Sequence, residues 1–242
     1  MLMYLIQKST ENIEICNKDF YQGTAIKGVL FDMDGVILDT EKLYIRFWKE
    51  AAQLLGFSMT HEMTLGMRSL SRELGERKLK EYLGEEVDYE KVRNTRVELM
   101  TAFIQEHGVE LKPGIHELLH FLKEKGIKTS IATSSPLDRT KEYLSQVGLG
   151  DAFDELVSGH MVPQGKPAPD IYLYAAEKLG LKPEECLVIE DSPTGLLAGM
   201  RAGCVPVMIP DQDQPNDETK ERIYAVVDSL QAIISLFSMV EG

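Results

Sequence analysis

Cysteine is scarce in this sequence, which has 242 residues and only three cysteines: Cys16, Cys186 and Cys204. Their odd number and the lack of C-x-x-C spacing exclude a disulfide framework and fit reduced thiols. Long apolar runs are missing too, since no window approaches the roughly 18 residues of a membrane-spanning helix. The opening run MLMYLI has no preceding positive charge or cleavage pattern, which excludes a secretory signal. We expect a cytoplasmic protein without membrane contact.

Positive charge is in short supply, with 26 Lys and Arg residues against 39 Asp and Glu residues and a net charge of −13. No basic stripe is visible, and such a chain repels phosphate backbones and anionic lipids. Nucleic acid is therefore not expected as a partner. The length and the 43% hydrophobic content indicate one or two domains with a sizeable core.

Short apolar segments alternate with segments of helical spacing. Strands are predicted for residues 26–31, 127–133, 186–190 and 205–209. Their near-continuous hydrophobicity is typical of parallel strands covered on both faces. Helical spacing is found at residues 115–122, 137–147 and 171–179. This alternation predicts an α/β fold whose strands present their carboxyl ends at one sheet edge, where ligands bind.

Residues 41–111 depart from this pattern, because they contain helical spacing and no convincing strand. We interpret them as a helical domain inserted into a core made of residues 25–40 and 112–242. The turn Lys112-Pro113-Gly114 marks the return to the core. Residues 1–24 form an extension whose structure the sequence leaves open between a strand, a partly ordered arm and a start-site artefact.

The first strand leads into Asp32-Met33-Asp34-Gly35. Alternate positions place Asp32 and Asp34 on the same side of the chain, at the edge where ligands bind. A polar turn would explain the pair equally well if nothing else pointed to chemistry. A calcium loop is excluded, since Val36 and Ile37 stand where a ligand and a glycine are required.

A second acidic pair, Glu190 and Asp191, ends the predicted strand at residues 186–190. Carboxylates converging on one edge repel each other unless a cation lies between them. Oxygen ligands of this kind, with room for water and phosphate oxygens, favour Mg²⁺ over Ca²⁺. An exposed acidic turn is the alternative for this pair taken alone.

Hydroxyl and cationic groups follow two further segments. Thr133-Ser134-Ser135-Pro136 closes a strand and leads into a helix, where hydroxyls and free N–H groups can hold a phosphate. Helix capping is the first interpretation of Ser135. Lys166 lies in the proline-stiffened loop GKPAPD. It is not a Walker lysine, because the glycine spacing is wrong and Pro167 replaces the required Ser or Thr. A surface lysine is its alternative.

Four ordered motifs, DMDGV, IATSS, GKPAPD and IEDSPTG, together resemble the haloacid dehalogenase superfamily. The resemblance extends from about residue 27 to the end of the chain and concerns the phosphatase and phosphomutase branch that carries a helical cap. It implies a Rossmann-like three-layer core, a mobile all-helical cap and a small phosphorylated metabolite, such as a sugar or nucleoside monophosphate, as substrate.

The resemblance also implies residue roles. Asp32 would be the nucleophile that forms an aspartyl-phosphate, and Asp34 the general acid and base. Thr133 and Ser134 would hold the phosphate, and Lys166 would stabilise its charge. The Mg²⁺ group would consist of Asp32, Asp34, Glu190 and Asp191. Because expelling halide needs no proton donor, Asp34 disfavours dehalogenase activity.

The phosphate acceptor decides between two enzyme classes. Water makes the chain a phosphatase, which we expect, and a second sugar hydroxyl makes it a phosphomutase of the β-phosphoglucomutase type. Similar mutases carry a histidine on the helix after the first motif, where this chain has Tyr44. This departure disfavours the mutase. A catalytically silent binding protein is a third reading, which the intact motifs disfavour.

Several other residues are assigned from their position alone. Arg68, Glu41 and Tyr44 are candidate substrate contacts from the cap and its hinge, with solvated side chains as the alternative. The histidines lack ligand spacing and are expected at the surface: His61, His107, His116, His120 and His160. Every fourth residue from Gly195 to Gly203 is glycine, which predicts close packing of a helix on the sheet. We expect a monomer, with a dimer as the alternative.

Overall fold

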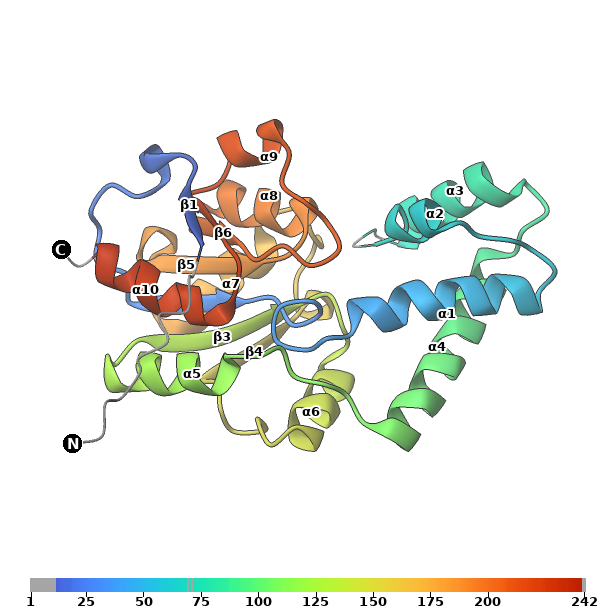
Figure 1. The fold of residues 1–242 in the computed structure, drawn as a ribbon, viewed down its shortest axis with the longest axis horizontal. Coiled ribbons are helices and arrows are strands. Elements are labelled where there is room, and N and C mark those ends of the chain that lie inside the picture. Colours follow the sequence, from blue (N-terminus) through green and yellow to red (C-terminus); the bar gives the residue numbers. More distant parts are fainter. Residues whose placement is uncertain (1–11, 69, 71, 241–242) are drawn as a thin grey trace, which may run out of the picture.

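The computed structural model describes residues 12–68, 70 and 72–240, with a seven-stranded sheet at its centre (Figure 1). The order across the sheet is β1-β7-β6-β5-β2-β3-β4. Only the β1–β7 pair is antiparallel among the described strand pairs. The strands are β1 (Ile13–Ile15), β2 (Gly28–Phe31), β3 (Lys128–Thr133), β4 (Glu155–Ser158), β5 (Cys186–Glu190), β6 (Val205–Met208) and β7 (Ala225–Val227).

Four strands were predicted from apolar runs, and all four are present. The strand at 186–190 has the predicted bounds, and the other three are shorter by one or two residues at one end. β1, β4 and β7, which have three or four residues each, were not predicted. Part of the N-terminal extension is therefore an edge strand, while residues 1–11 lie outside the described residues.

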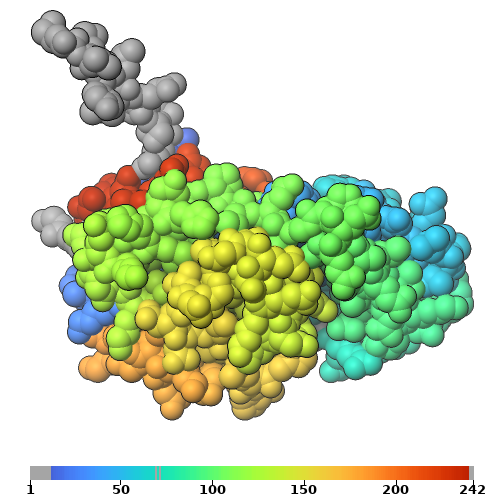
Figure 2. Space-filling view, turned by 90° about the horizontal axis from the view of Figure 1, so that it is seen from below, coloured from blue at the N-terminus to red at the C-terminus, as the bar shows by residue number. Residues whose placement is uncertain are grey.

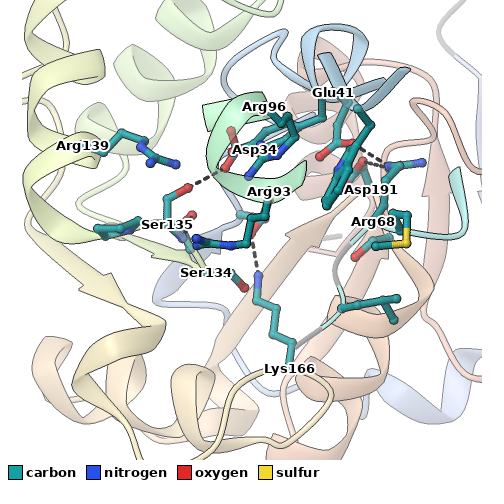
Figure 3. Close-up of a pocket in the computed structure, with 18 of the residues that line it drawn as sticks. Asp34, Glu41, Arg68, Arg93, Arg96, Ser134, Ser135, Arg139, Lys166 and Asp191 are labelled. Atoms are coloured by element: carbon teal, nitrogen blue, oxygen red, sulfur yellow. Dashed lines mark hydrogen bonds and ion pairs between the residues drawn. The ribbon is translucent and has the colours of Figure 1, made fainter. Parts of the chain in front are cut away.

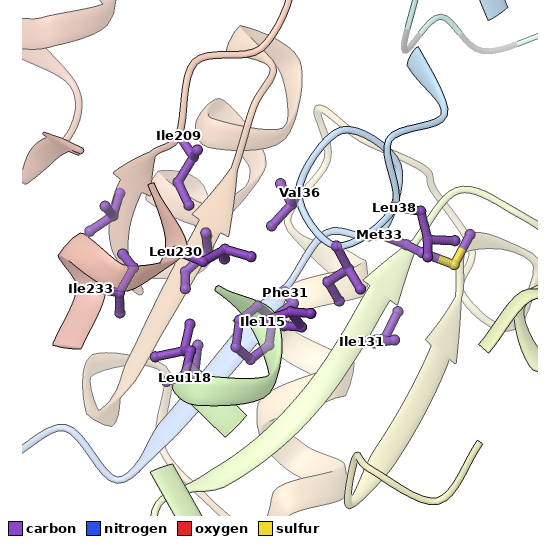
Figure 4. Close-up of a cluster of buried hydrophobic side chains, with 14 of the residues drawn as sticks. Phe31, Met33, Val36, Leu38, Ile115, Leu118, Ile131, Ile209, Leu230 and Ile233 are labelled. Carbon is purple, nitrogen blue, oxygen red and sulfur yellow. The ribbon is translucent and has the colours of Figure 1, made fainter. Parts of the chain in front are cut away.

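Helices cover both faces of the sheet, and the alternation of side chains in β2 shows why. Val29 and Phe31 join one apolar cluster with residues of α5, α6 and α10, and Figure 4 shows Phe31 of this cluster with Ile115 and Leu230. Leu30 joins another cluster with residues of α7 and α8. The three-layer α/β core is thus confirmed. These helices are α5 (Ile115–Glu124), α6 (Leu137–Gln146), α7 (Asp170–Leu179), α8 (Pro193–Ala202), α9 (Asp217–Glu221) and α10 (Leu230–Val240).

Four helices between β2 and α5 form a helical insert at one end of the elongated molecule (Figures 1 and 2). They are α1 (Glu41–Leu54), α2 (His61–Leu65), α3 (Arg72–Leu83) and α4 (Tyr89–His107). Trp48, Leu79 and Val92 belong to an apolar cluster of their own in this insert. The insert therefore has an apolar cluster of its own, while Phe47 of α1 and Met100 of α4 belong to the cluster that contains Val29 and Phe31.

The two chain segments that join the insert to the core run side by side. Leu38 forms an antiparallel bridge with Leu111. The Asp39 amide donates to the Glu110 carbonyl at 2.9 Å, and the Lys112 amide donates to the Ile37 carbonyl at 2.8 Å. We refer to residues 37–39 and 110–112 as the paired linkers. Among the described residues, none of the helices is long and apolar enough to cross a membrane.

Candidate active site

The predicted motifs meet at the carboxyl edge of the sheet. Asp32 and Asp34 follow β2, Thr133 ends β3, and Glu190 and Asp191 lie at the end of β5, which neighbours β2. All of them line a cavity of about 280 Å³ between the core and the helical insert (Figure 3). The grouping of distant motifs expected from the sheet topology is therefore present.

Lys166 is the buried cation of this cavity, with 7% of its surface exposed. Its Nζ donates to Asp32 Oδ1 at 2.5 Å, to Glu190 Oε1 at 2.6 Å and to the Ala132 carbonyl at 3.0 Å. Burial alone would lower the pKa of Lys166, but the Asp32 and Glu190 carboxylates raise it above its ordinary value. The ammonium therefore stays charged at neutral pH beside both carboxylates.

Asp34 has a separate set of partners. Its Oδ1 accepts a hydrogen bond from the Thr40 hydroxyl at 2.6 Å, and its Oδ2 accepts one from the Ser135 hydroxyl at 3.1 Å. Thr40 precedes α1 without capping it, since its hydroxyl is directed at Asp34. Burial raises the pKa of Asp34, and the two hydroxyls act against this rise. The carboxyl group is thus easier to protonate than one in water.

Asp32, Glu190 and Asp191 form a cluster in which one oxygen from each lies within 4.8 Å of the others. Burial raises the pKa of Asp32 and of Asp191, and the neighbouring carboxylates raise both further. An all-oxygen donor set with excess negative charge suits a hard divalent cation, so these residues fit Mg²⁺. Asp34, also expected in this group, is outside the cluster, and its carboxylate is bound by Thr40 and Ser135.

Glu190 is held in place by its own neighbours. Its Oε1 also accepts from the Tyr172 hydroxyl at 2.7 Å, and its Oε2 accepts from the Ser192 hydroxyl at 3.1 Å. Ser192 in turn caps α8 by accepting from the Gly195 amide at 3.1 Å, with Pro193 in the first turn. A Cβ at Gly195 would lie 1.7 Å from Glu190 Oε1. The glycine therefore lets the carboxylate approach the helix.

The predicted packing role of the spaced glycines is confirmed at two of three positions. Besides Gly195, a Cβ at Gly199 would lie 3.0 Å from Val188 of β5. The prediction was wrong for Gly203, which has φ 80° and ends α8, and a Cβ there would come no closer than 3.9 Å to another atom.

Arg68 binds three carboxylates and connects the helical insert to the core, because Glu41 belongs to the insert and Asp191 and Asp213 belong to the core. Its Nε donates to Glu41 at 2.5 Å, its Nη2 to Asp191 at 2.8 Å and its Nη1 to Asp213 at 3.0 Å. Burial raises the pKa of Glu41 to about 7, although the Arg68 charge opposes the rise. Arg68 and Glu41, both expected to contact substrate, do line the cavity, but here they bind each other.

The other predicted contacts also line the cavity. Tyr44 is half-buried, and the Arg96 guanidinium lies 4.9 Å from its ring centre. Ser134 is exposed after β3, and the Thr133 hydroxyl accepts from the Ser135 amide at 3.0 Å. The geometry is compatible with an anion near Thr133 and Ser134.

The cavity residues that were not predicted as site residues include Arg93, Arg96, Ser135, Arg139 and His160. Ser135 was interpreted as a helix cap, but Pro136 is the residue that precedes α6 and Ser135 binds Asp34. His160 is exposed as expected, yet it also lines the cavity. The sequence could have indicated Arg96, because its charge interrupts the apolar face of α4.

Comparison with known proteins places this geometry in context. A family model described as haloacid dehalogenase-like hydrolase matches residues 26–203. A phosphorylated carbohydrates phosphatase of Thermotoga maritima is 34% identical over 209 residues, which are 85% of this chain and 87% of the relative. The beta-phosphoglucomutase of Bacillus subtilis is 32% identical over 198 residues, 78% of this chain and 85% of the relative.

Solved structures show the same likeness. CbbY from Rhodobacter sphaeroides, solved in complex with phosphate, superposes with a TM-score of 0.67 and is 26% identical. The match covers 85% of this chain and 95% of CbbY. It therefore extends over most of both chains.

Proposed function

This chain belongs to the haloacid dehalogenase-like hydrolase family, and on that premise we propose that it is a Mg²⁺-dependent phosphatase of a small phosphorylated carbohydrate. The observation that carries the proposal is the contact of Lys166 Nζ with Asp32 Oδ1 at 2.5 Å in a cavity that Asp34 also lines. The phosphatase name of the Thermotoga maritima relative supports the carbohydrate class. A nucleoside monophosphate is the other substrate class that the motifs allow.

Asp32 is suited to be the nucleophile. Burial raises its pKa, but Lys166 opposes that rise and favours the carboxylate that attack requires. An Asp32 oxygen attacks phosphorus in line, so that a P–O bond to Asp32 forms while the ester P–O bond breaks. The aspartyl-phosphate that results divides one difficult displacement into two easier ones.

Asp34 is suited to move the proton. Its raised pKa leaves a protonated fraction that can donate to the departing ester oxygen. As a carboxylate it then takes a proton from the water that attacks the aspartyl-phosphate. The Thr40 and Ser135 hydroxyls orient it during both steps.

The charge on the phosphate is balanced by groups around Asp32. Lys166 supplies a fixed positive charge, and Thr133 and Ser134 lie in the same cavity as hydrogen-bonding groups. Asp32, Glu190 and Asp191 would hold Mg²⁺, whose chemistry when bound is to neutralise phosphate oxygens.

A phosphomutase is the second candidate, because one of the relatives carries that name. In a mutase a second sugar hydroxyl, not water, takes the phosphate, and the helix residue facing it assists proton transfer. The ordinary pKa of tyrosine is already well above neutral. Burial raises the pKa of Tyr44 further, and the Asp34 charge adds to the rise. Because proton shuttles work best with a pKa close to the working pH, Tyr44 favours the phosphatase.

Phosphate release from a panel of sugar and polyol phosphates tests the proposal. We expect Mg²⁺-dependent release that EDTA abolishes and that Asp32→Asn lowers by at least about a thousandfold. Glucose 1-phosphate with a trace of glucose 1,6-bisphosphate serves as the mutase arm. Glucose 6-phosphate as the only product would replace the phosphatase by the mutase, and unchanged turnover in Asp32→Asn would refute both.

A further inference from the structure

Tyr172 of α7 is a fully buried side chain that the mechanism proposed above does not use. Its ring belongs to the apolar cluster that contains Leu30 and Val188, and its hydroxyl donates to Glu190 Oε1 at 2.7 Å. It is not one of the described residues that line the cavity. The hydroxyl therefore acts on Glu190 and not on a substrate.

The two carboxylate oxygens of Glu190 are bound unequally. Oε1 accepts from Lys166 Nζ at 2.6 Å and from the Tyr172 hydroxyl at 2.7 Å. Oε2 accepts from the Ser192 hydroxyl at 3.1 Å and from the Ser192 amide at 3.3 Å. Each carboxylate oxygen has two lone pairs, so two short hydrogen bonds occupy Oε1 fully. Oε2 has only longer and weaker bonds, which a cation can replace.

Lys166 alone is a poor anchor for Oε1, because its ammonium is shared with Asp32 at 2.5 Å and with the Ala132 carbonyl at 3.0 Å. The last torsion of a glutamate side chain is also broad, so one shared bond leaves the carboxylate free to rotate. Tyr172 lies in the first turn of α7 with its ring packed in the core, and its ring centre is 5.0 Å from Lys166 Nζ. The tyrosine thus contacts both Glu190 and the lysine that binds it, from a fixed position.

We infer that Tyr172 is a positioning residue for the proposed Mg²⁺ site: it fixes Oε1 of Glu190 and leaves Oε2 as the oxygen for the ion. Asp32 and Asp191 complete the cluster, in which one oxygen of each residue lies within 4.8 Å of the others. Hydrogen bonds that orient a metal-binding carboxylate contribute about tenfold to a hundredfold to metal affinity. The inference rests on the proposed function, because Mg²⁺ binding is part of it.

Isothermal titration calorimetry of the metal-free protein with MgCl₂ tests the inference. Tyr172→Phe removes one oxygen and keeps the ring, so the packing in the core and the contact with Lys166 remain. We expect the Kd for Mg²⁺ to rise by about tenfold or more. A Kd within about twofold of that of the unmodified protein, or a lower Kd, would overturn the inference.

Tyr174→Phe is the matched control. Tyr174 lies on the same helix, is half-buried and has Lys178 Nζ 5.7 Å from its ring centre, and it is not among the described residues of the cavity. This variant should keep the Kd for Mg²⁺ within about twofold of the starting value. An equal rise in both variants would mean that any change in α7 weakens the site, and the specific role of Tyr172 would be refuted.

A double-mutant cycle shows whether Glu190 carries the effect. Glu190→Gln removes a charge from the cluster and should itself weaken Mg²⁺ binding. In that background Tyr172→Phe should raise the Kd by less than about twofold further, because the group that the hydroxyl positions is gone. A further rise of about tenfold would show that Tyr172 acts by another route and would contradict the inference.

Phosphate release separates a metal effect from general damage to the site. In Tyr172→Phe the Mg²⁺ concentration for half-maximal release should rise with the Kd, and saturating Mg²⁺ should restore kcat to within about threefold. A loss of kcat that saturating Mg²⁺ does not restore would count against a role in positioning the metal site.

The inference and the proposed function fail in different ways. The calorimetric test does not require turnover, so absence of phosphate release from every ester, with Mg²⁺ binding intact, would contradict the phosphatase alone. Equal Mg²⁺ affinity of Tyr172→Phe and the unmodified protein, with phosphate release intact, would remove the role of Tyr172 and leave the phosphatase standing. Absence of Mg²⁺ binding to the unmodified protein would refute the inference together with the Mg²⁺ requirement.

Discussion

Removal of the Lys166 side chain should lower both stability and activity. Lys166 neutralises two buried carboxylates, Asp32 and Glu190, at 2.5 and 2.6 Å. Lys166→Met leaves both without their cationic partner, so in metal-free protein we expect the free energy of unfolding at pH 7 to fall by about 3 to 5 kcal/mol. Urea unfolding measures the loss, and phosphate release should fall with it.

A matched control separates this effect from loss of surface charge. Lys141 of α6 is exposed, so Lys141→Met should change the free energy of unfolding by less than about 0.5 kcal/mol. Equal stability of the two variants would show that the contact of Lys166 with the two carboxylates contributes little in solution.

Glu41 gives the molecule a specific pH dependence. Its pKa rises from 4.5 to about 7 on folding, chiefly through burial. The folded state then binds more protons than the unfolded state between these values, so stability contributed by this group falls as pH rises through that window. Above pH 7, the free energy of unfolding is lower by about 3 kcal/mol through Glu41 than it is below pH 4.5.

Carbon-13 chemical shifts of the Glu41 carboxyl, followed by NMR in metal-free protein, measure this pKa directly. Glu41→Gln supplies the comparison in pH-dependent unfolding, because the decline between pH 4.5 and 7 should become shallower. A Glu41 titration centred at its ordinary value would contradict the prediction.

At the scale of elements, the contact of α8 with the end of β5 depends on Gly195. Alanine there would place Cβ 1.7 Å from Glu190 Oε1, so Glu190 or the helix must move. Gly195→Ala should therefore lower stability by about 1 to 3 kcal/mol and displace Glu190 from Lys166. Thermal unfolding and phosphate release together measure the effect.

Gly150 provides the control for that substitution. A Cβ there meets no atom closer than 3.8 Å, and the residue does not have a positive φ. Gly150→Ala should behave like the unmodified protein in both assays. Normal activity in Gly195→Ala would mean that the helix can shift without moving Glu190.

The elements themselves show what the sequence could predict. The strand at 186–190 was found with its bounds because four consecutive apolar residues, 186–189, are followed by the acidic pair Glu190 and Asp191. β4 and β7 could not be predicted from their own residues. They are strands because they pair with β3 and β6, and such pairing leaves no pattern in the local sequence.

The site residues likewise divide into those that the sequence could predict and those that it could not. Asp32, Lys166 and Asp191 could be predicted because each lies in a motif with a recognisable order. Arg93 and Arg139 could not, because one belongs to the helical insert and the other to the core. Only the packing of the insert against the core brings them to the same cavity. Ser135 was misinterpreted because capping and side-chain hydrogen bonding require the same hydroxyl.

For the whole molecule, Arg68 couples the position of the helical insert to the charge of the proposed Mg²⁺ site. It holds Asp191 at 2.8 Å while binding Asp213 of the core. Because its positive charge repels a cation at Asp191, Arg68→Met should tighten Mg²⁺ binding by about fivefold to tenfold. Isothermal titration calorimetry with MgCl₂ measures the change.

Arg77→Met, which removes an exposed arginine of the same insert, controls for net charge. It should leave Mg²⁺ affinity within about twofold of the starting value, because charges far apart in water are screened. Weaker Mg²⁺ binding in Arg68→Met would instead mean that Arg68 positions Asp191 for the ion.

The paired linkers give the helical insert the mechanics of a lever. The two chain connections of the helical insert run side by side at one place, where Leu38 faces Leu111. α4 has 19 residues and begins at the far end of that lever, so its length is about 28 Å. A rotation of about 10° at the linkers would move the far end of α4 by about 5 Å while the bridge stays intact. Such a rotation would change a few backbone torsions beside Asp39 and Glu110, and it would also separate Arg68 from Asp191 and Asp213.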